Sequence, residues 1–73
     1  MRLGVDDPRS QFVEGVWFNG RQIKNAVEVD TDEGWVRVVV VLSEETLQPY
    51  LENGEIVIAR YDGKVEIRGS VPA

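Results

Sequence analysis

The carboxylates are the side chains of this sequence with the widest chemical capacity, because the chain contains neither histidine nor cysteine. Their absence removes the usual general base at neutral pH, the commonest metal ligand and the thiolates of zinc sites. The acidic residues that gather most densely are Glu28, Asp30, Asp32 and Glu33, followed by the pair Glu44 and Glu45.

The first acidic cluster begins like a calcium-binding loop, since Asp30 and Asp32 precede Gly34. An EF-hand loop needs glycine at its sixth position and glutamate at its twelfth, whereas here, counted from Asp30, glycine is fifth and Val41 is twelfth. Hydrolysis of a glycoside by paired carboxylates would need a cleft, and a chain of 73 residues offers little concavity. We therefore predict no metal, no cofactor and no enzymatic activity.

The charge balance also bears on partners. Eight basic and thirteen acidic side chains give a net charge of −5, which argues against binding to nucleic acid or to an anionic membrane. The same acidity leaves open an alternative function, in which the chain imitates the phosphates of DNA and inhibits a DNA-binding or nuclease complex. The decoy charges would be Glu28, Asp30, Asp32, Glu33, Glu44 and Glu45. Because charges of both signs are interspersed, a solvated surface is the simpler interpretation.

Aromatic side chains indicate a different function, because Trp and Tyr are enriched at protein interfaces. Trp17 follows an apolar residue and precedes another, so its own side chain is expected to point away from the core. The alternative is that Trp17 and Trp35 pair across strands and cover the second face of the sheet. The candidate interface comprises Trp17, Trp35, Val39, Val41, Val57 and Tyr61, and predicts a protein partner or a homo-oligomer.

Turn residues divide the chain into strands. Asn19-Gly20 and Asp62-Gly63 are typical of the tight turns of β-hairpins, and 31–34 supplies a third turn in which Gly34 takes a left-handed conformation. Between the Asn19-Gly20 turn and the 31–34 turn, apolar and polar residues alternate along Arg21–Asp30, which predicts one strand with Val27 and Val29 on the same face. Two further hairpins should flank the 31–34 and Asp62-Gly63 turns.

The segment after the second hairpin turn is the most apolar. From Trp35 to Leu42 the chain is rich in valine, and its second half is apolar on both faces, which predicts a central strand or an interface. Ser43 followed by two glutamates resembles a helix start, and Pro49 limits the helix to one or two turns.

These elements predict a mainly β fold. We expect a single five-stranded antiparallel meander, either a small bent sheet or an SH3-like open barrel, with one short helical turn between the third and fourth strands. Residues 1–11 would form a flexible N-terminal segment, 12–69 the β domain and 70–73 a C-terminal tail. No signal peptide or apolar stretch long enough for a transmembrane helix is evident, which predicts a soluble protein.

The segment from Val16 to Arg68, which contains VWFNGRQIKNAVEVDTDEGWV and ends in YDGKVEIR, resembles small β-rich proteins of bacteriophages and prophages. The resemblance implies an accessory or minor structural role in a phage, located in the bacterial cytoplasm or in a virion, and supplies no catalytic residue. With the candidate interface, it leads to the expectation of a non-enzymatic β module that binds a protein or assembles with itself.

Overall fold

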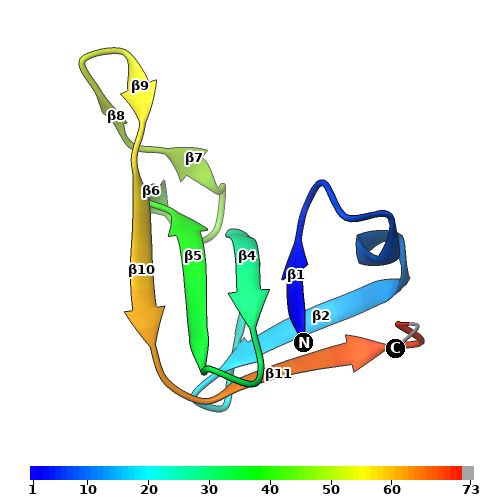
Figure 1. The fold of residues 1–73 in the computed structure, drawn as a ribbon. Helices are drawn as coiled ribbons and strands as arrows, with labels where there is room; N and C mark the ends of the chain where they lie inside the picture. The colour runs from blue at the N-terminus through cyan, green and yellow to red at the C-terminus, as the bar shows by residue number, and fades with distance from the viewer. Residues whose placement is uncertain (72–73) are drawn as a thin grey trace.

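The computed structural model describes residues 1–71 and confirms a mainly β fold (Figure 1). In chain order the strands are β1 (Arg2–Gly4), β2 (Val13–Phe18), β3 (Arg21–Ile23), β4 (Ala26–Asp30), β5 (Trp35–Val39), β6 (Val41–Ser43), β7 (Gln48–Pro49), β8 (Leu51–Glu52), β9 (Glu55–Ile56), β10 (Ile58–Asp62) and β11 (Val65–Gly69), and the 3₁₀ helix η1 (Pro8–Phe12) precedes β2. A larger sheet has the order β1-β4-β5-β10 and a smaller sheet the order β11-β2-β3. The pairs β6-β7 and β8-β9 are separate two-stranded ribbons.

The predicted five-stranded single sheet or SH3-like barrel is wrong, because the described residues form eleven strands in four sheets. One cause is a break in the predicted strand Arg21–Asp30. The backbone carbonyl of Asn25 accepts a hydrogen bond from the Val39 amide (2.9 Å), and the Asn25 side-chain amide donates to the Val39 carbonyl (2.7 Å). These bonds anchor Asn25 to the end of β5, so β3 stays in the smaller sheet and β4 enters the larger one.

The predicted hairpin around Asp62-Gly63 is also wrong. β10 pairs with β5 and β11 pairs with β2, so this segment carries the chain from one sheet to the other. The Gly63 amide donates to the Gly34 carbonyl (2.9 Å), and the Lys64 amide donates to the side-chain oxygen of Asn19 (2.8 Å). We call the site formed by Asn19, Gly34, Gly63 and Lys64 the corner, because it joins the turns of both sheets.

The two other predicted hairpins are confirmed. Asn19 and Gly20 have φ of 50° and 83° and connect β2 to β3, as a tight hairpin turn requires. The turn 31–34 connects β4 to β5, with Gly34 at φ 77°. β5 lies between β4 and β10, so residues 35–39 form a central strand as predicted. The predicted strand Trp35–Leu42 is too long, because the chain leaves the larger sheet after Val39 and continues as β6, which pairs with β7.

No helix forms between residues 43 and 53, contrary to the prediction. The Leu47 amide donates to the Ser43 carbonyl (2.9 Å), which closes one isolated α-turn. Because Leu47 has φ 56°, this turn does not continue into a helix. The chain returns as β7, and Asn53-Gly54 then forms the hairpin turn between β8 and β9. Residues 41–56, which we call the hairpin extension, project beyond the larger sheet (Figure 1).

The predicted flexible N-terminal segment is in part a strand. β1 pairs with β4 at the edge of the larger sheet, and Leu3 is only 5% exposed. The single apolar residue of this short strand is buried, and that burial is the physical reason for its order. Of the predicted tail, Val71 packs against the core, whereas residues 72–73 lie outside the described part of the chain.

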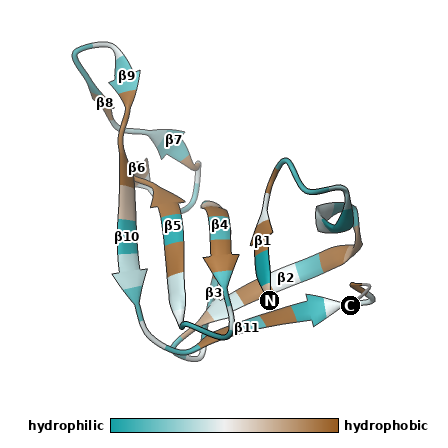
Figure 2. Ribbon diagram, viewed as in Figure 1, coloured by the Kyte–Doolittle hydropathy of each residue, from teal (hydrophilic) through white to brown (hydrophobic). Residues whose placement is uncertain are grey.

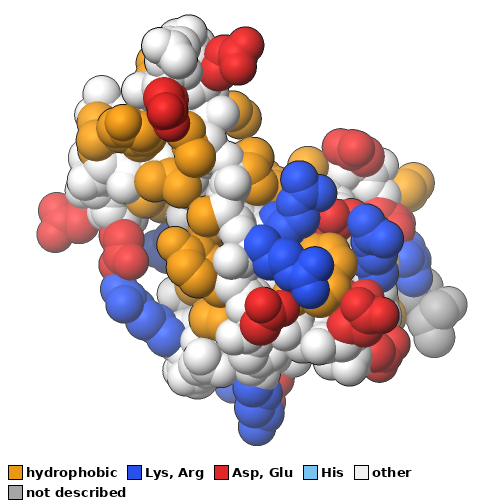
Figure 3. Space-filling view, turned by 60° about the vertical axis from the view of Figure 1, so that its left-hand side comes forward, with side chains coloured by type: hydrophobic (Ala, Val, Ile, Leu, Met, Phe, Trp, Pro, Cys, Tyr) orange, Lys and Arg blue, Asp and Glu red, His pale blue; other side chains and the backbone are white. Residues whose placement is uncertain are grey.

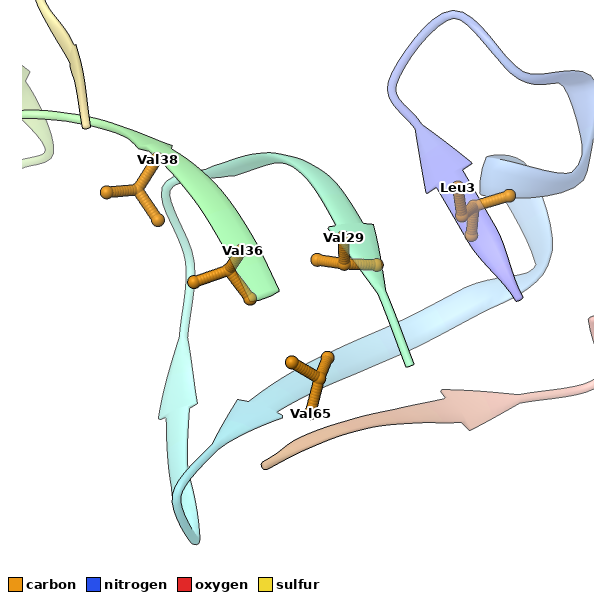
Figure 4. Close-up of a cluster of buried hydrophobic side chains, with 5 residues drawn as sticks. All are labelled: Leu3, Val29, Val36, Val38 and Val65. Atoms are coloured by element: carbon orange, nitrogen blue, oxygen red, sulfur yellow. The ribbon is translucent and has the colours of Figure 1, made fainter. Parts of the chain in front are cut away.

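The core lies between the two sheets. Its buried side chains are Leu3, Val29, Val36, Val38 and Val65 (Figure 4). Figure 2 shows the corresponding hydrophobic stretches on β4, β5 and β11. The sequence predicts Val27 and Val29 on one face of the strand, and this is wrong because a β-bulge lies between Ala26 and Glu28. Ala26 packs against the core and pairs with Val38, while Val29 pairs with Val36.

The close contact at the corner predicts that one added methyl group at position 34 strongly destabilises the fold. An alanine Cβ at Gly34 would lie 2.7 Å from the Gly63 carbonyl oxygen, at a φ that alanine adopts poorly. We predict that Gly34→Ala lowers the free energy of unfolding by about 2 kcal/mol, measured by urea denaturation. Gly4→Ala is the matched control, because its Cβ would meet no atom closer than 3.7 Å. Equal losses in the two variants would contradict the role of the corner.

Candidate functional site

Trp35 does not form an exposed anchor. It is only 5% exposed, and the guanidinium groups of Arg2 and Arg60 lie 5.5 Å and 4.9 Å from its ring centroid. Its indole N–H donates to the Glu33 carboxylate at 3.4 Å. These cation–π contacts cover the ring from β1 and β10, so the outer face of the larger sheet presents charged groups instead of an apolar surface.

Trp17 lies in the other sheet, so the alternative in which the two tryptophans pair across strands is wrong. On β2 it stands opposite Glu66 on one side and Gln22 on the other. The Arg68 guanidinium lies 4.0 Å from its ring centroid, and its ring passes so close to Gly15 that a Cβ there would lie 2.5 Å from the ring. Trp17 is half-buried on this separate surface.

Of the remaining candidate interface residues, Val39, Val41 and Val57 lie in or beside the hairpin extension, and Tyr61 lies toward the far end of β10. Val39 and Val41 line a groove of about 360 Å³ together with Leu47, Pro49 and Ile56. The carbonyl of Val57, which precedes β10, accepts a hydrogen bond from the Val40 amide. Tyr61 is 52% exposed and its ring centroid lies 6.5 Å from that of Phe18. The predicted interface is therefore divided, and only its valines lie in or beside the extension, since Tyr61 pairs with Val36 toward the other end of β5.

The acidic candidates are engaged in local contacts at the larger sheet. Glu28 pairs with Arg2 at 3.0 Å and with Arg37 at 3.2 Å, and the Arg2 hydrogen bond is the main cause that lowers the pKa of Glu28. The Asp30 carboxylate accepts hydrogen bonds from the backbone amides of Glu33 and Asp32, both at 2.9 Å. The bond from Glu33 contributes most to a lowered pKa of Asp30.

The acidic residues also do not share one surface. Glu28, Asp30, Asp32 and Glu33 belong to β4 and the turn at the start of β5, whereas Glu44 and Glu45 follow β6, beyond the other end of β5. Glu44, in the turn after β6, forms an ion pair with Arg21 of β3. Among residues 1–71, no group of three or more acidic side chains is arranged to hold a metal ion.

The hairpin extension carries the apolar surface that the sequence interpretation missed. Leu51 and Ile56 stand directly opposite each other on β8 and β9 and are 54% and 55% exposed. Other exposed apolar side chains of the extension are Leu42, Leu47 and Tyr50. In Figure 3 hydrophobic side chains run from this region down the side of the molecule. The signal is the Asn53-Gly54 dipeptide, which is typical of a hairpin turn and lies between Leu51-Glu52 and Glu55-Ile56.

Searches against protein-family models, curated proteins and solved structures find no match to this chain. Within residues 1–71, no helix is long and apolar enough to span a membrane.

The Asp30 turn predicts a pH-dependent stability. Because the pKa of Asp30 is lowered in the folded chain, its contribution is present above the unfolded pKa of about 4 and is lost as the pH falls through the lowered value. We predict that Asp30→Asn lowers the melting temperature at pH 7 by about 5 °C and that this difference shrinks toward pH 3. Asp6→Asn, at an exposed position, is the control of equal charge change. A difference that is the same at pH 7 and pH 3 would contradict the account.

Proposed function

We propose that this chain is a non-enzymatic β module that acts by binding protein, either a partner or another copy of itself, through the hairpin extension. The observation that carries the proposal is the pair of exposed apolar side chains, Leu51 and Ile56, on a ribbon that projects from the body. Exposed apolar groups that lie together cost free energy in water, and they are a usual mark of a protein interaction surface.

The contrast between the extension and the body supports this assignment. The outer face of the larger sheet is covered by paired charges, and Trp35 is screened by arginines. In the extension, by contrast, more than half of each of the Leu51 and Ile56 side chains is exposed. A partner that covers Leu51 and Ile56 would remove apolar surface from water at a site where the chain itself cannot do so.

The biological setting proposed here follows from the resemblance of Val16 to Arg68 to small phage proteins. In that setting the module would be an accessory or minor structural protein, located in a bacterial cytoplasm or in a virion. The acidic-decoy alternative gains no comparable support, since Glu28 and Glu44 are each paired with an arginine, and Glu28 stands beside the middle of β5 whereas Glu44 follows β6.

Photo-crosslinking tests the extension as a contact surface. A benzoylphenylalanine residue replaces Leu51 in one variant and Val5 in another, two apolar positions that are 54% and 62% exposed. On irradiation in the producing cells, we expect discrete protein adducts from position 51 at several times the yield from position 5. Equal yields from both positions would contradict the proposal, because random collision samples the two sites alike.

A further inference from the structure

β10 is an edge strand of the larger sheet, and no element of residues 1–71 pairs with its outer side (Figure 1). The Val57 carbonyl and the Gly63 amide, just before and after β10, both form hydrogen bonds toward the β5 side. Because bonding direction alternates along an antiparallel strand, Ile58, Arg60 and Asp62 direct their amides and carbonyls away from β5. Among residues 1–71, no backbone hydrogen bond reaches these outward groups. They form an open edge of the kind that accepts another strand.

The other edge strands of the two main sheets are covered, short or bulged. In β1, the Arg2 carbonyl accepts a hydrogen bond from the Arg9 side chain (3.2 Å). The Gly4 carbonyl of the same strand accepts one from the Asp7 amide (3.1 Å). In the smaller sheet, β3 has only three residues, and a β-bulge interrupts β11 near its end. These features hinder pairing with another chain, whereas β10 keeps five residues in an uninterrupted register with β5.

The smaller sheet also leaves β10 accessible. A cleft of about 390 Å³ lies between β3 and β10, and it is lined by Ile23 of β3 and by Tyr61 of β10. Tyr61 is half exposed, so its ring is available on the inner face of the open edge. An additional strand can therefore join β10 without displacing the smaller sheet.

The charges of β10 favour a second copy of the same strand. Arg60 and Asp62 lie on one face, form an ion pair at 3.2 Å and are both largely exposed. A strand with a cation and an anion two residues apart is complementary to itself in the antiparallel direction, because each cation then stands opposite an anion. The ion pair within each copy is retained in this arrangement, since charges of the two strands alternate in sign.

One antiparallel register satisfies both the backbone and the side chains. Outward-directed backbone groups must face each other, so Arg60 can pair with Arg60 or with Asp62 of the other copy. Pairing of Arg60 with itself sets two guanidinium groups directly opposite each other, which is unfavourable. Pairing of Arg60 with Asp62 sets opposite charges together and places the two Tyr61 rings side by side as a cross-strand aromatic pair.

We infer that two copies of the chain form a two-fold dimer in which their β10 strands pair antiparallel, with Tyr61 at the symmetry axis and Arg60 opposite Asp62 of the other copy. The two larger sheets then become one continuous sheet across the dimer. This contact lies outside the hairpin extension, residues 41–56, so it is independent of the proposed function. The extension of each copy stays free to bind a partner.

Sedimentation across a concentration series tests the dimer. We expect the wild-type chain to dimerise and Arg60→Asp to raise the dimer dissociation constant by about tenfold or more, because carboxylates then face each other. Arg68→Asp is the matched control, since Arg68 also lies over a tryptophan ring and pairs with a carboxylate two residues away, but on the bulged strand β11. A wild-type chain that stays monomeric up to about 1 mM overturns the inference, and so do equal effects of the two substitutions.

A charge exchange tests the pairing of Arg60 with Asp62. Arg60→Asp and Asp62→Arg should each dimerise poorly alone, because each homodimer would bring like charges together. An equimolar mixture of the two variants should recover a heterodimer, because every guanidinium again faces a carboxylate. Recovery also demonstrates that both variants are folded. A mixture no more associated than its components overturns the inference.

A single introduced cysteine tests the register, since the chain has no cysteine of its own. At a concentration where sedimentation shows a dimer, Tyr61→Cys treated with oxidised glutathione should give a disulfide-linked dimer, because the two thiols meet at the axis. Ala59→Cys is the control on the same face of β10, two residues from the axis, and should remain unlinked. Equal yields from the two variants, or no linked dimer from Tyr61→Cys, overturn the inference.

Discussion

The corner formed by Asn19, Gly34, Gly63 and Lys64 is the contact on which the rest of the structure depends. There the turn of β4-β5 meets the crossing from β10 to β11, and the Asn19 side chain ties in the turn of β2-β3. Only glycine at position 34 permits this approach, because any Cβ would collide with the Gly63 carbonyl. With the sheets joined at this point, their inner faces enclose the small valine-rich core that a chain without disulfides needs.

Closure at the corner does not join the edge strands of the two sheets. β3 and β10 do not pair with each other, and the cleft between them exposes part of the apolar lining. The same side carries the hairpin extension, in which two short ribbons have too few residues to bury Leu51 and Ile56. The body and the extension therefore differ: the body buries a core cluster between its two sheets, and the extension leaves its apolar pair exposed.

Local turn chemistry made part of this fold predictable. Asn19-Gly20 and Gly34 determine their turns within a few residues, so the sequence predicts both hairpins correctly. Asp62-Gly63 has the same local pattern, but β5 and β2 compete for the strands on either side, and this long-range pairing prevails. The candidate site was harder to predict for a related reason. Strand alternation placed Trp17 and Trp35 on a common face, whereas the break at Asn25 assigns them to different sheets.

Amide hydrogen exchange of the full chain tests most directly whether the fold depends on the corner. The amides of Gly63 and Lys64, which donate to Gly34 and Asn19, should exchange as slowly as the amides of β5. Exchange of these two amides as fast as in an unfolded chain, while the amides of β5 stay protected, would contradict the dependence of the fold on this contact.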